Sequence, residues 1–204
     1  MPRPRARRRV AGPAWAAALA LVVAGGAHAA PEVSISAGST LGANGAPGEG
    51  GAAGSVAILW PFEERFAFGA VIHADDLGTA LTDLTDANFG TPLGTVADRH
   101  RWSFGAGWRA EARLLESRRW RLLWGAEFGY GRQERDVRGK VDDAVSGVLV
   151  ATGPALLWTA AAGHSFGFTT AWKHAFVSRE ADDGRTTDWA ALGLAWRWRW
   201  ARSQ

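Results

Sequence analysis

The sequence predicts an all-β protein: an eight-stranded antiparallel up-and-down transmembrane β-barrel preceded by a cleaved signal peptide. Three observations lead to this prediction. Segments of about ten residues alternate between large apolar and small or polar side chains, as strands do. Turn residues separate these segments at regular intervals. The apolar face also carries far more aromatic volume than the interior of an eight-stranded barrel can hold.

The N-terminus has the three parts of a secretory signal peptide. Five arginines lie between Arg3 and Arg9, an Ala/Leu/Val-rich run without charge extends from 10 to 27, and Ala27-His28-Ala29 provides a small-x-small cleavage site. We therefore divide the chain into a signal peptide, residues 1–29, and an outer-membrane barrel domain, residues 30–204. A buried N-terminal helix is the alternative. The mature protein should begin at Ala30.

Cleavage changes what the charge implies. The whole chain has 23 basic and 20 acidic residues, but removal of the five arginines leaves 18 basic residues and a net charge of −2. The basic balance of the precursor is therefore no evidence for a nucleic-acid partner. The absence of cysteine excludes disulfides, thiolate metal sites and an N-terminal lipoprotein anchor.

Period-two alternation defines the expected strands. In the fourth segment, for example, Trp102, Phe104 and Trp108 share one face, and Arg101 and Arg109 share the other. The eight segments cover residues 33–41, 54–60, 66–74, 101–113, 120–131, 146–158, 165–176 and 188–200.

The sixth segment has an alternative. Residues 144–163 carry no formal charge and are long enough to span a membrane as a helix. Three glycines and the central Pro154 weaken a helix, so we favour a strand over 146–158. Pro154 then requires a bulge or a missing ladder bond.

The connections alternate in length. Long ones are expected at 43–53, 75–99, 132–145 and 178–187, and short ones at 61–65, 115–119 and 159–164. This order suits a closed antiparallel sheet with both termini at the short-turn end. Outer-membrane barrels have short periplasmic turns and longer outer loops.

The aromatic face should point outward to lipid, because a soluble barrel would have to bury it. Many aromatic residues fall near the predicted strand ends, as expected for girdles at the two membrane–water interfaces. The girdle tryptophans are Trp60, Trp102, Trp120, Trp158, Trp196, Trp198 and Trp200. Trp189 is a further candidate near the long loops.

The C-terminal sequence "GLAWRWRWARSQ" alternates tryptophan with arginine. Aromatic and basic residues together can bind single-stranded nucleic acid, but the net charge of the mature chain disfavours this. We interpret the segment as the closing strand, with its tryptophans toward lipid and Arg197 and Arg199 toward the lumen.

This architecture resembles the small eight-stranded outer-membrane barrels of the OmpA/OmpX type over nearly all of residues 31–200. The resemblance implies a bacterial outer-membrane location, with lipid and lipopolysaccharide as partners. In that group a final strand ending in an aromatic residue is similar to the signal read by the barrel-assembly machinery. This sequence departs from that pattern, because "ARSQ" follows the aromatic residue Trp200.

The predicted lumen face carries charged residues, which are costly to bury unless paired. Pairing across the 115–119 turn should place Glu127 diagonal to Arg109, and Glu111 diagonal to Arg121. We expect an ion-pair network that plugs the lumen; a narrow conducting channel is the alternative. The members of the expected ion-pair network are Arg101, Arg109, Glu111, Arg113, Arg121, Glu127, Lys173 and Arg197.

Histidines raise the possibility of an enzyme. Some small outer-membrane barrels are lipid A-type hydrolases, and His73, His100, Ser103 and Asp98 could meet near the outer rim. A solvated rim is the simpler interpretation. No phosphate loop, zinc motif, calcium loop or nucleotide fingerprint is present, so we expect no cofactor and no metal.

The sequence therefore favours a non-enzymatic protein with a structural or surface-interaction role. Most acidic residues fall in the predicted outer loops, where we expect a solvated surface; cation bridging to lipopolysaccharide and adhesion are the alternatives.

Overall fold

A computed structural model describes residues 30–41, 51–62, 64–85, 92–137, 140–161, 163–177 and 188–200 of the protein. Over residues 79–85, 92–99, 135–137, 140–143 and at 177 only the backbone is described. The predicted signal peptide, residues 1–29, lies outside these ranges.

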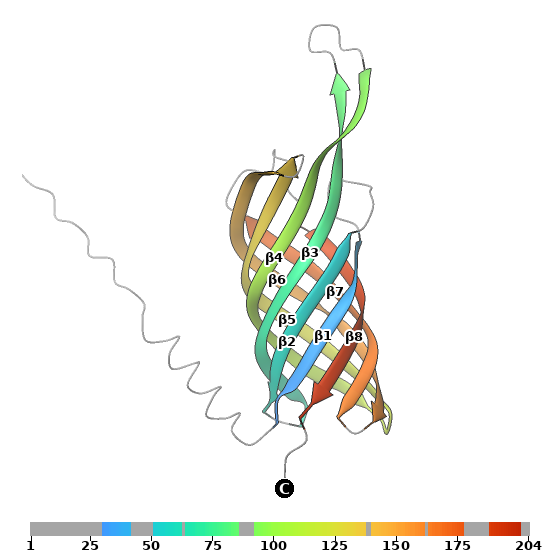
Figure 1. Cartoon of the computed structure of the whole chain (residues 1–204). Helices are drawn as coiled ribbons and strands as arrows, with labels where there is room; N and C mark the ends of the chain where they lie inside the picture. Colours follow the sequence, from blue (N-terminus) through green and yellow to red (C-terminus); the bar gives the residue numbers. More distant parts are fainter. Residues whose placement is uncertain are drawn as a thin grey trace, which may run out of the picture.

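Eight antiparallel strands form one closed barrel, in which each strand pairs with its neighbours in sequence (Figure 1). The strands are β1 (Glu32–Leu41), β2 (Ala52–Pro61), β3 (Phe66–Thr85), β4 (Pro92–Glu116), β5 (Trp120–Val137), β6 (Lys140–Ala161), β7 (His164–Val177) and β8 (Asp188–Arg199). The predicted fold class is confirmed.

The seam between β1 and β8 closes the barrel. Glu32 pairs with Arg199 at one end of the seam and Leu41 pairs with Ala190 at the other. The C-terminal segment is therefore the closing strand. The start of β1 and the end of β8 lie at the end of the barrel that carries the short turns (Figure 1).

Two of the predicted long loops are largely strand. β3 and β4 stay paired up to Thr85 and Pro92, and β5 and β6 up to Val137 and Lys140. The β3–β4 hairpin therefore projects well beyond the rest of the barrel (Figure 1). The loops expected at 75–99 and 132–145 were wrong in extent, because strands outside a membrane need no apolar face and lose the alternation that reveals them.

β6 is a strand and not a membrane-spanning helix. No helix long and apolar enough to cross a membrane occurs within the described residues. Pro154 pairs with Trp124 on β5, but Gly153 and Pro154 have no partner in the β6–β7 register, which is the same on both sides of the gap. The proline therefore interrupts one ladder, as expected for a residue without an N–H group.

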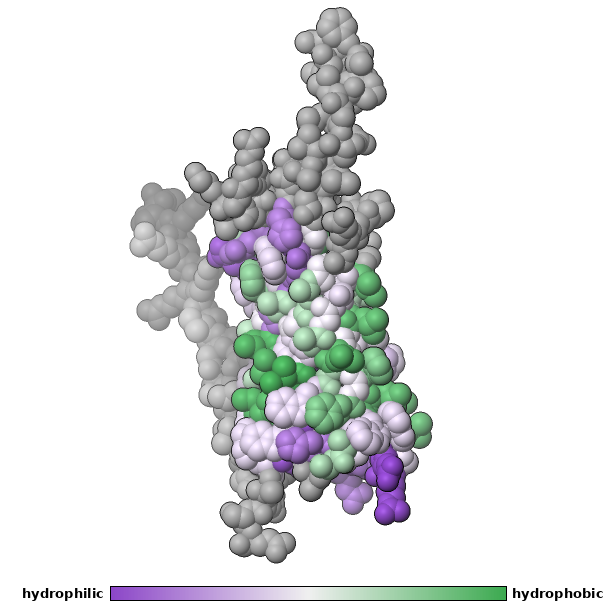
Figure 2. Space-filling model, turned by 45° about the vertical axis from the view of Figure 1, so that its right-hand side comes forward, coloured by the Kyte–Doolittle hydropathy of each residue, from purple (hydrophilic) through white to green (hydrophobic). Residues whose placement is uncertain are grey.

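The outer wall is apolar. Figure 2 shows hydrophobic side chains gathered in a band around the middle of the wall, with more hydrophilic ones toward its ends. Phe128, Phe168 and Leu194 are each more than half exposed. Large apolar side chains left outside a closed barrel suit a lipid environment, which confirms the predicted orientation of the two faces.

A new charge on the outer face of β8 should cost more free energy of folding the farther it lies from the strand end. Leu194 is 62% exposed on the outer face, so Leu194→Arg should cost about 2–4 kcal/mol if it lies near the midplane. Trp198→Arg, close to the strand end, should cost about 0–1 kcal/mol, and Arg197→Lys should keep a cation in the lumen. Urea unfolding in lipid vesicles measures these values. Equal costs at 194 and 198 would contradict the depth assigned to them.

Candidate functional site: charged side chains in the barrel lumen

The lumen contains an extensive network of buried ion pairs. Its centre is the contact between Arg197 on β8 and Glu111 on β4. The guanidinium binds the carboxylate through two hydrogen bonds, Nη1 to Oε2 at 2.6 Å and Nη2 to Oε1 at 2.7 Å. Both side chains are about 95% buried or more. A two-bond, charge-assisted contact of this kind is among the strongest available in a protein interior.

Glu32, near the start of β1, joins three arginines at the short-turn end of the lumen. Arg199 donates to its Oε1 through Nε at 2.6 Å and also through Nη2. Arg197 Nη1 lies 3.4 Å from Oε2, and Arg121 Nη1 lies 3.8 Å from Oε1. Arg121 also donates to Ser165 Oγ at 2.5 Å.

The pairs across the β4–β5 turn differ from the prediction. Arg109 and Glu127 are directly opposite and not diagonal, and their Nη1 and Oε1 atoms lie 2.8 Å apart. Arg109 Nε donates to Glu111 at the same distance. The predicted Glu111–Arg121 contact was wrong: Arg121 pairs with Glu116 next to the short turn, whereas Glu111 pairs with Gly125 and contacts Arg197 across the lumen.

Because Arg109 has a second carboxylate partner, Glu127→Ala should be milder than the loss of an isolated buried pair. We expect about 1.5–3 kcal/mol, the range for hydrogen bonds to charged groups. Arg109→Ala should cost more, since it removes a partner of both carboxylates. A double-mutant cycle by urea unfolding should show that Glu127→Ala costs less once Arg109 is absent. Strictly additive losses would contradict the contact.

A second charged layer lies toward the outer end. Lys173 Nζ on β7 donates to Asp75 Oδ2 on β3 at 2.6 Å, and Trp189 Nε1 donates to the same oxygen at 3.1 Å. Trp189 also packs in an apolar cluster with Leu77, Leu149 and Ala175.

Trp189 was expected in the outer girdle, and that prediction was wrong. Its side chain is 1% exposed and it faces the lumen. The sequence contained the necessary information, because Trp189 and Arg197 are separated by an even number of residues on β8 and therefore share a face.

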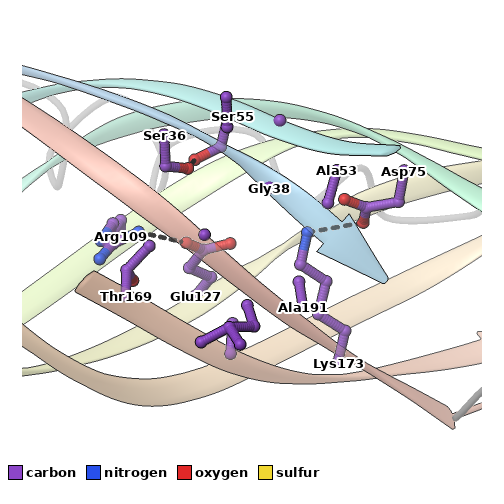
Figure 3. A pocket seen from close by; sticks show the side chains of 15 residues that line it. Ser36, Gly38, Ala53, Ser55, Asp75, Arg109, Glu127, Thr169, Lys173 and Ala191 are labelled. Carbon is purple, nitrogen blue, oxygen red and sulfur yellow. Dashed lines mark hydrogen bonds and ion pairs between the residues drawn. The ribbon is translucent and has the colours of Figure 1, made fainter. Parts of the chain in front are cut away.

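A small cavity of about 40 Å³ separates the two charged layers (Figure 3). Asp75 and Lys173 line one side of it, and Arg109 and Glu127 line another. Ser36 and Ser55, whose hydroxyls lie 2.7 Å apart, complete much of its polar surface. The cavity has room for more than one water molecule and enough polar partners to hold them.

The ion pairs within the two layers span the whole lumen. Arg197–Glu111 joins β8 to β4, Lys173–Asp75 joins β7 to β3, and Arg121–Glu32 joins β5 to β1. In a ring of eight strands each of these pairs is four strands apart, so each contact crosses the barrel instead of following its wall.

Two other predicted lumen residues lie nearer the ends. Arg113 pairs with Glu116 at 2.5 Å, and this pair is partly exposed at the short-turn end. Arg101 is buried on the lumen side of β4, 6% exposed.

The histidine residues considered for catalysis are not brought together. Ser103 is opposite Asp75 on the lumen side of the wall, and His73 is also buried there, with no hydrogen-bond partner on either ring nitrogen. His100 instead pairs with Asp76 at 3.0 Å, and its ring lies tilted against Trp102 on the outward face, with centroids 5.1 Å apart. The side chain of Asp98 lies outside the described residues.

Gly105 leaves the space that His73 occupies. A Cβ atom added at Gly105 would lie 2.2 Å from His73 Cε1. The absence of a side chain at Gly105 explains how the imidazole ring of His73 fits into the narrow lumen. The ring lies against the backbone, and no serine is in hydrogen-bonding contact with it.

The predicted girdle residues all lie on the outward face. Trp198 and Trp200 have ring centroids 4.3 Å apart at the short-turn end, where His164 also stacks against Trp196 and Trp198. Trp102, near the middle of the long strand β4, lies farther from the short turns. The remaining girdle residues at the short-turn end are Trp60, Trp120 and Trp158.

No protein-family model matches the sequence, and no curated protein matches it closely enough to be counted as a relative. Solved structures do share the fold. Neisserial surface protein A has a TM-score of 0.58 at 10% identity, over 83% of this chain and 96% of that one. A major outer membrane protein from Thermus thermophilus has a TM-score of 0.53 at 13% identity, over 83% of this chain and 99% of that one.

At these identities the likeness concerns the fold. It confirms the resemblance to small outer-membrane barrels, and together with the apolar outer wall it supports the predicted location in the bacterial outer membrane.

Proposed function

We propose that this protein is a non-enzymatic, non-conducting outer-membrane barrel whose extended hairpins act as a surface-interaction platform. The observation that carries the proposal is the set of three ion-pair contacts across the lumen. We expect these contacts to plug the barrel and to support β3–β4 and β5–β6, which project at the end opposite the start of β1 and the end of β8 (Figure 1).

The energetics of these contacts support a closed lumen. An ion that passed through would have to displace the Arg197–Glu111 and Lys173–Asp75 pairs, each of which is almost fully buried. A charge that is left buried without its partner costs about 3–5 kcal/mol. The apolar cluster around Trp189 adds a further barrier above the second pair.

Planar-bilayer recording tests this part of the proposal. The folded mature protein should produce no stepwise current, whereas a porin included as a positive control should do so. Heat-denatured protein provides the blank. Current steps that require the folded barrel would contradict the plugged lumen and favour the narrow channel.

Absence of catalysis is supported by the placement of the histidines, since His73 has no hydrogen-bonded serine and the ring of His100 lies on the other face. Cells that produce the wild-type protein and cells that produce His73→Ala should have the same lipid A mass spectrum. A deacylated species found with the wild type alone would favour the hydrolase.

We further propose lipopolysaccharide as the neighbour of the outer half of the wall, and the barrel-assembly machinery as the partner that recognises β8. The alternation of Trp196 and Trp198 with lumen-facing arginines supports the second of these. Cross-linking during assembly, with a photoreactive residue at Trp198, should capture the machinery; capture from Phe128 alone would contradict recognition through β8.

A further inference from the structure

The outer wall has an apolar groove at the short-turn end. The groove has a volume of about 510 Å³, within the roughly 300–1,000 Å³ typical of small-molecule sites. It lies across β5, β6, β7, β8 and β1, and nearly all of its lining is apolar. None of the lumen contacts described above involves it.

A continuous row of outward side chains forms one border of the groove. The strand register links Trp120 to Trp158, Trp158 to Phe166, Phe166 to Trp196 and Trp196 to Ile35. Each of these residues thus contacts or faces its neighbour on the next strand, and four of the five are aromatic.

One end of the row lies beside a short turn, and the other end lies deeper along the barrel wall. Trp120 is the first residue of β5, directly after the short turn, whereas Ile35 lies three residues inside β1. Deeper along the same strands the lining includes Phe168, which pairs with Leu194 on β8, and Ala37, which pairs with Leu194 across the seam. Ala37 has the smallest side chain on this part of the outward face and leaves the groove open.

Positive charge is concentrated at the aqueous end of the row. Arg118 and Arg119 are exposed in the turn that leads into Trp120, and no ion pair involves either of them within the described part of the chain. The Arg119 carbonyl accepts a hydrogen bond of 2.8 Å from the Thr159 amide. This bond ties the turn to the strand that carries Trp158.

We propose that this groove is a binding site for one anionic glycerophospholipid of the periplasmic leaflet. An acyl chain lies along the aromatic row toward Ile35, and the phosphate lies beside Arg118 and Arg119. The proposal deepens the proposed function, because it rests on the barrel lying in a membrane with its short turns toward the periplasm. It names the lipid partner of the inner half of the wall.

The charge and the shape of the site select this occupant. The tail fits an apolar groove open to hydrocarbon, and each arginine near a membrane surface adds attraction for an anionic headgroup. Aromatic rings at the interface supply a border that is apolar on one side and tolerant of water on the other.

For the test, the full mature chain is folded into vesicles of phosphatidylglycerol and phosphatidylcholine and then extracted in mild detergent. Native mass spectrometry measures how much lipid it retains. The wild type should retain one lipid, predominantly phosphatidylglycerol. Ala37→Phe should fill the groove and lower the retained fraction roughly tenfold, the effect of a moderate binding energy. Ala106→Phe is the matched control, since Ala106 is an exposed alanine on β4 away from the groove, and it should retain lipid as the wild type does.

The headgroup is tested separately. Arg118→Gln with Arg119→Gln should reduce the preference for phosphatidylglycerol over phosphatidylcholine by about fivefold for each arginine. Arg65→Gln, at an exposed arginine in another short turn, should leave the preference unchanged. Equal retention of both lipids by the wild type would overturn the headgroup assignment.

Other outcomes would overturn the site itself. Equal loss of lipid by Ala37→Phe and Ala106→Phe, or no loss by either, would show that the groove is not selective. A lipid-free dimer would identify a second copy of the chain as the occupant. Failure of the wild type to fold into vesicles, seen as absence of heat-modifiable gel mobility, would instead contradict the membrane location on which the proposal rests.

Discussion

Deletion of residues 193–204 is expected to abolish barrel closure. The deletion removes most of β8, including the residues that pair with β1 from Glu32 to Gly38 and with β7 from His164 to Thr169. Both neighbouring strands would then expose unpaired N–H and C=O groups, each of which costs several kcal/mol in hydrocarbon. We expect the truncated protein to lose all heat-modifiable gel mobility after exposure to vesicles.

Deletion of residues 201–204 is the matched control. β8 ends at Arg199, so this shorter deletion keeps every strand pair and should leave the folded mobility intact. The nucleic-acid interpretation of the tail makes the opposite prediction, since a protein without 193–204 would fold and lose only oligonucleotide binding. A truncated protein that inserts with the folded mobility would contradict the role of β8.

Glu111→Ala should be the most damaging single substitution in the lumen. Glu111 is 4% exposed and binds both Arg197, through two hydrogen bonds, and Arg109. Removal of the carboxylate leaves the Arg197 guanidinium buried with only the longer contact to Glu32. We expect a loss of about 3–5 kcal/mol, as measured when one member of a buried pair is removed.

Glu116→Ala is the control, because Glu116 also pairs with an arginine on β4 but its side chain is 49% exposed. Exposed pairs contribute about 0–1 kcal/mol. Replacement of Arg197 by leucine in the Glu111→Ala background should recover part of the loss, since no buried cation is then left unpaired at this position. Similar urea midpoints for Glu111→Ala and Glu116→Ala would contradict the burial and the contact across the lumen.

Alternation along each strand was enough to predict which face of the barrel a residue occupies. Residues such as Arg109, Glu111 and Glu127 were placed in the lumen on parity alone, and the outward position of Trp120 and Trp158 follows from the same period. Parity also predicts Trp189 correctly once it is applied through to the first residues of β8. The error there came from giving proximity to a loop more weight than the face.

Contacts across the lumen could not be predicted in this way. Which residue of β8 meets which residue of β4 depends on the tilt and stagger of all the strands between them, and a single bulge between Arg113 and Leu115 changes the answer. The sequence analysis therefore identified the charged residues and missed the pairing of Glu111 with Arg197. Across the short β4–β5 turn the sequence associated Arg109 with Glu127, although as diagonal neighbours, and wrongly associated Glu111 with Arg121.

The length of the hairpins was also beyond the sequence pattern. Outside the membrane both faces of a strand meet water, so the hydrophobic alternation that marks strand ends at Ala74 and Gly131 stops before the strands do. Gly78, with φ of 79°, marks a register shift inside β3 at this boundary. The strand ends predicted from alternation thus correspond to the limits of the apolar band and not to the limits of pairing.

Cysteine cross-linking across the β1–β8 seam tests barrel closure and register most directly. The chain contains no cysteine, so two introduced thiols are the only ones present. Ala37 and Leu194 are paired across the seam, and directly opposed Cβ atoms in antiparallel strands lie about 4.5–5.5 Å apart, close to disulfide distance. Oxidation of Ala37→Cys with Leu194→Cys in intact cells should form the disulfide, and Val33→Cys with Leu194→Cys should not. Cross-linking of the Val33 pair but not the Ala37 pair, or of neither, would contradict the closed barrel with the register on which the lumen contacts depend.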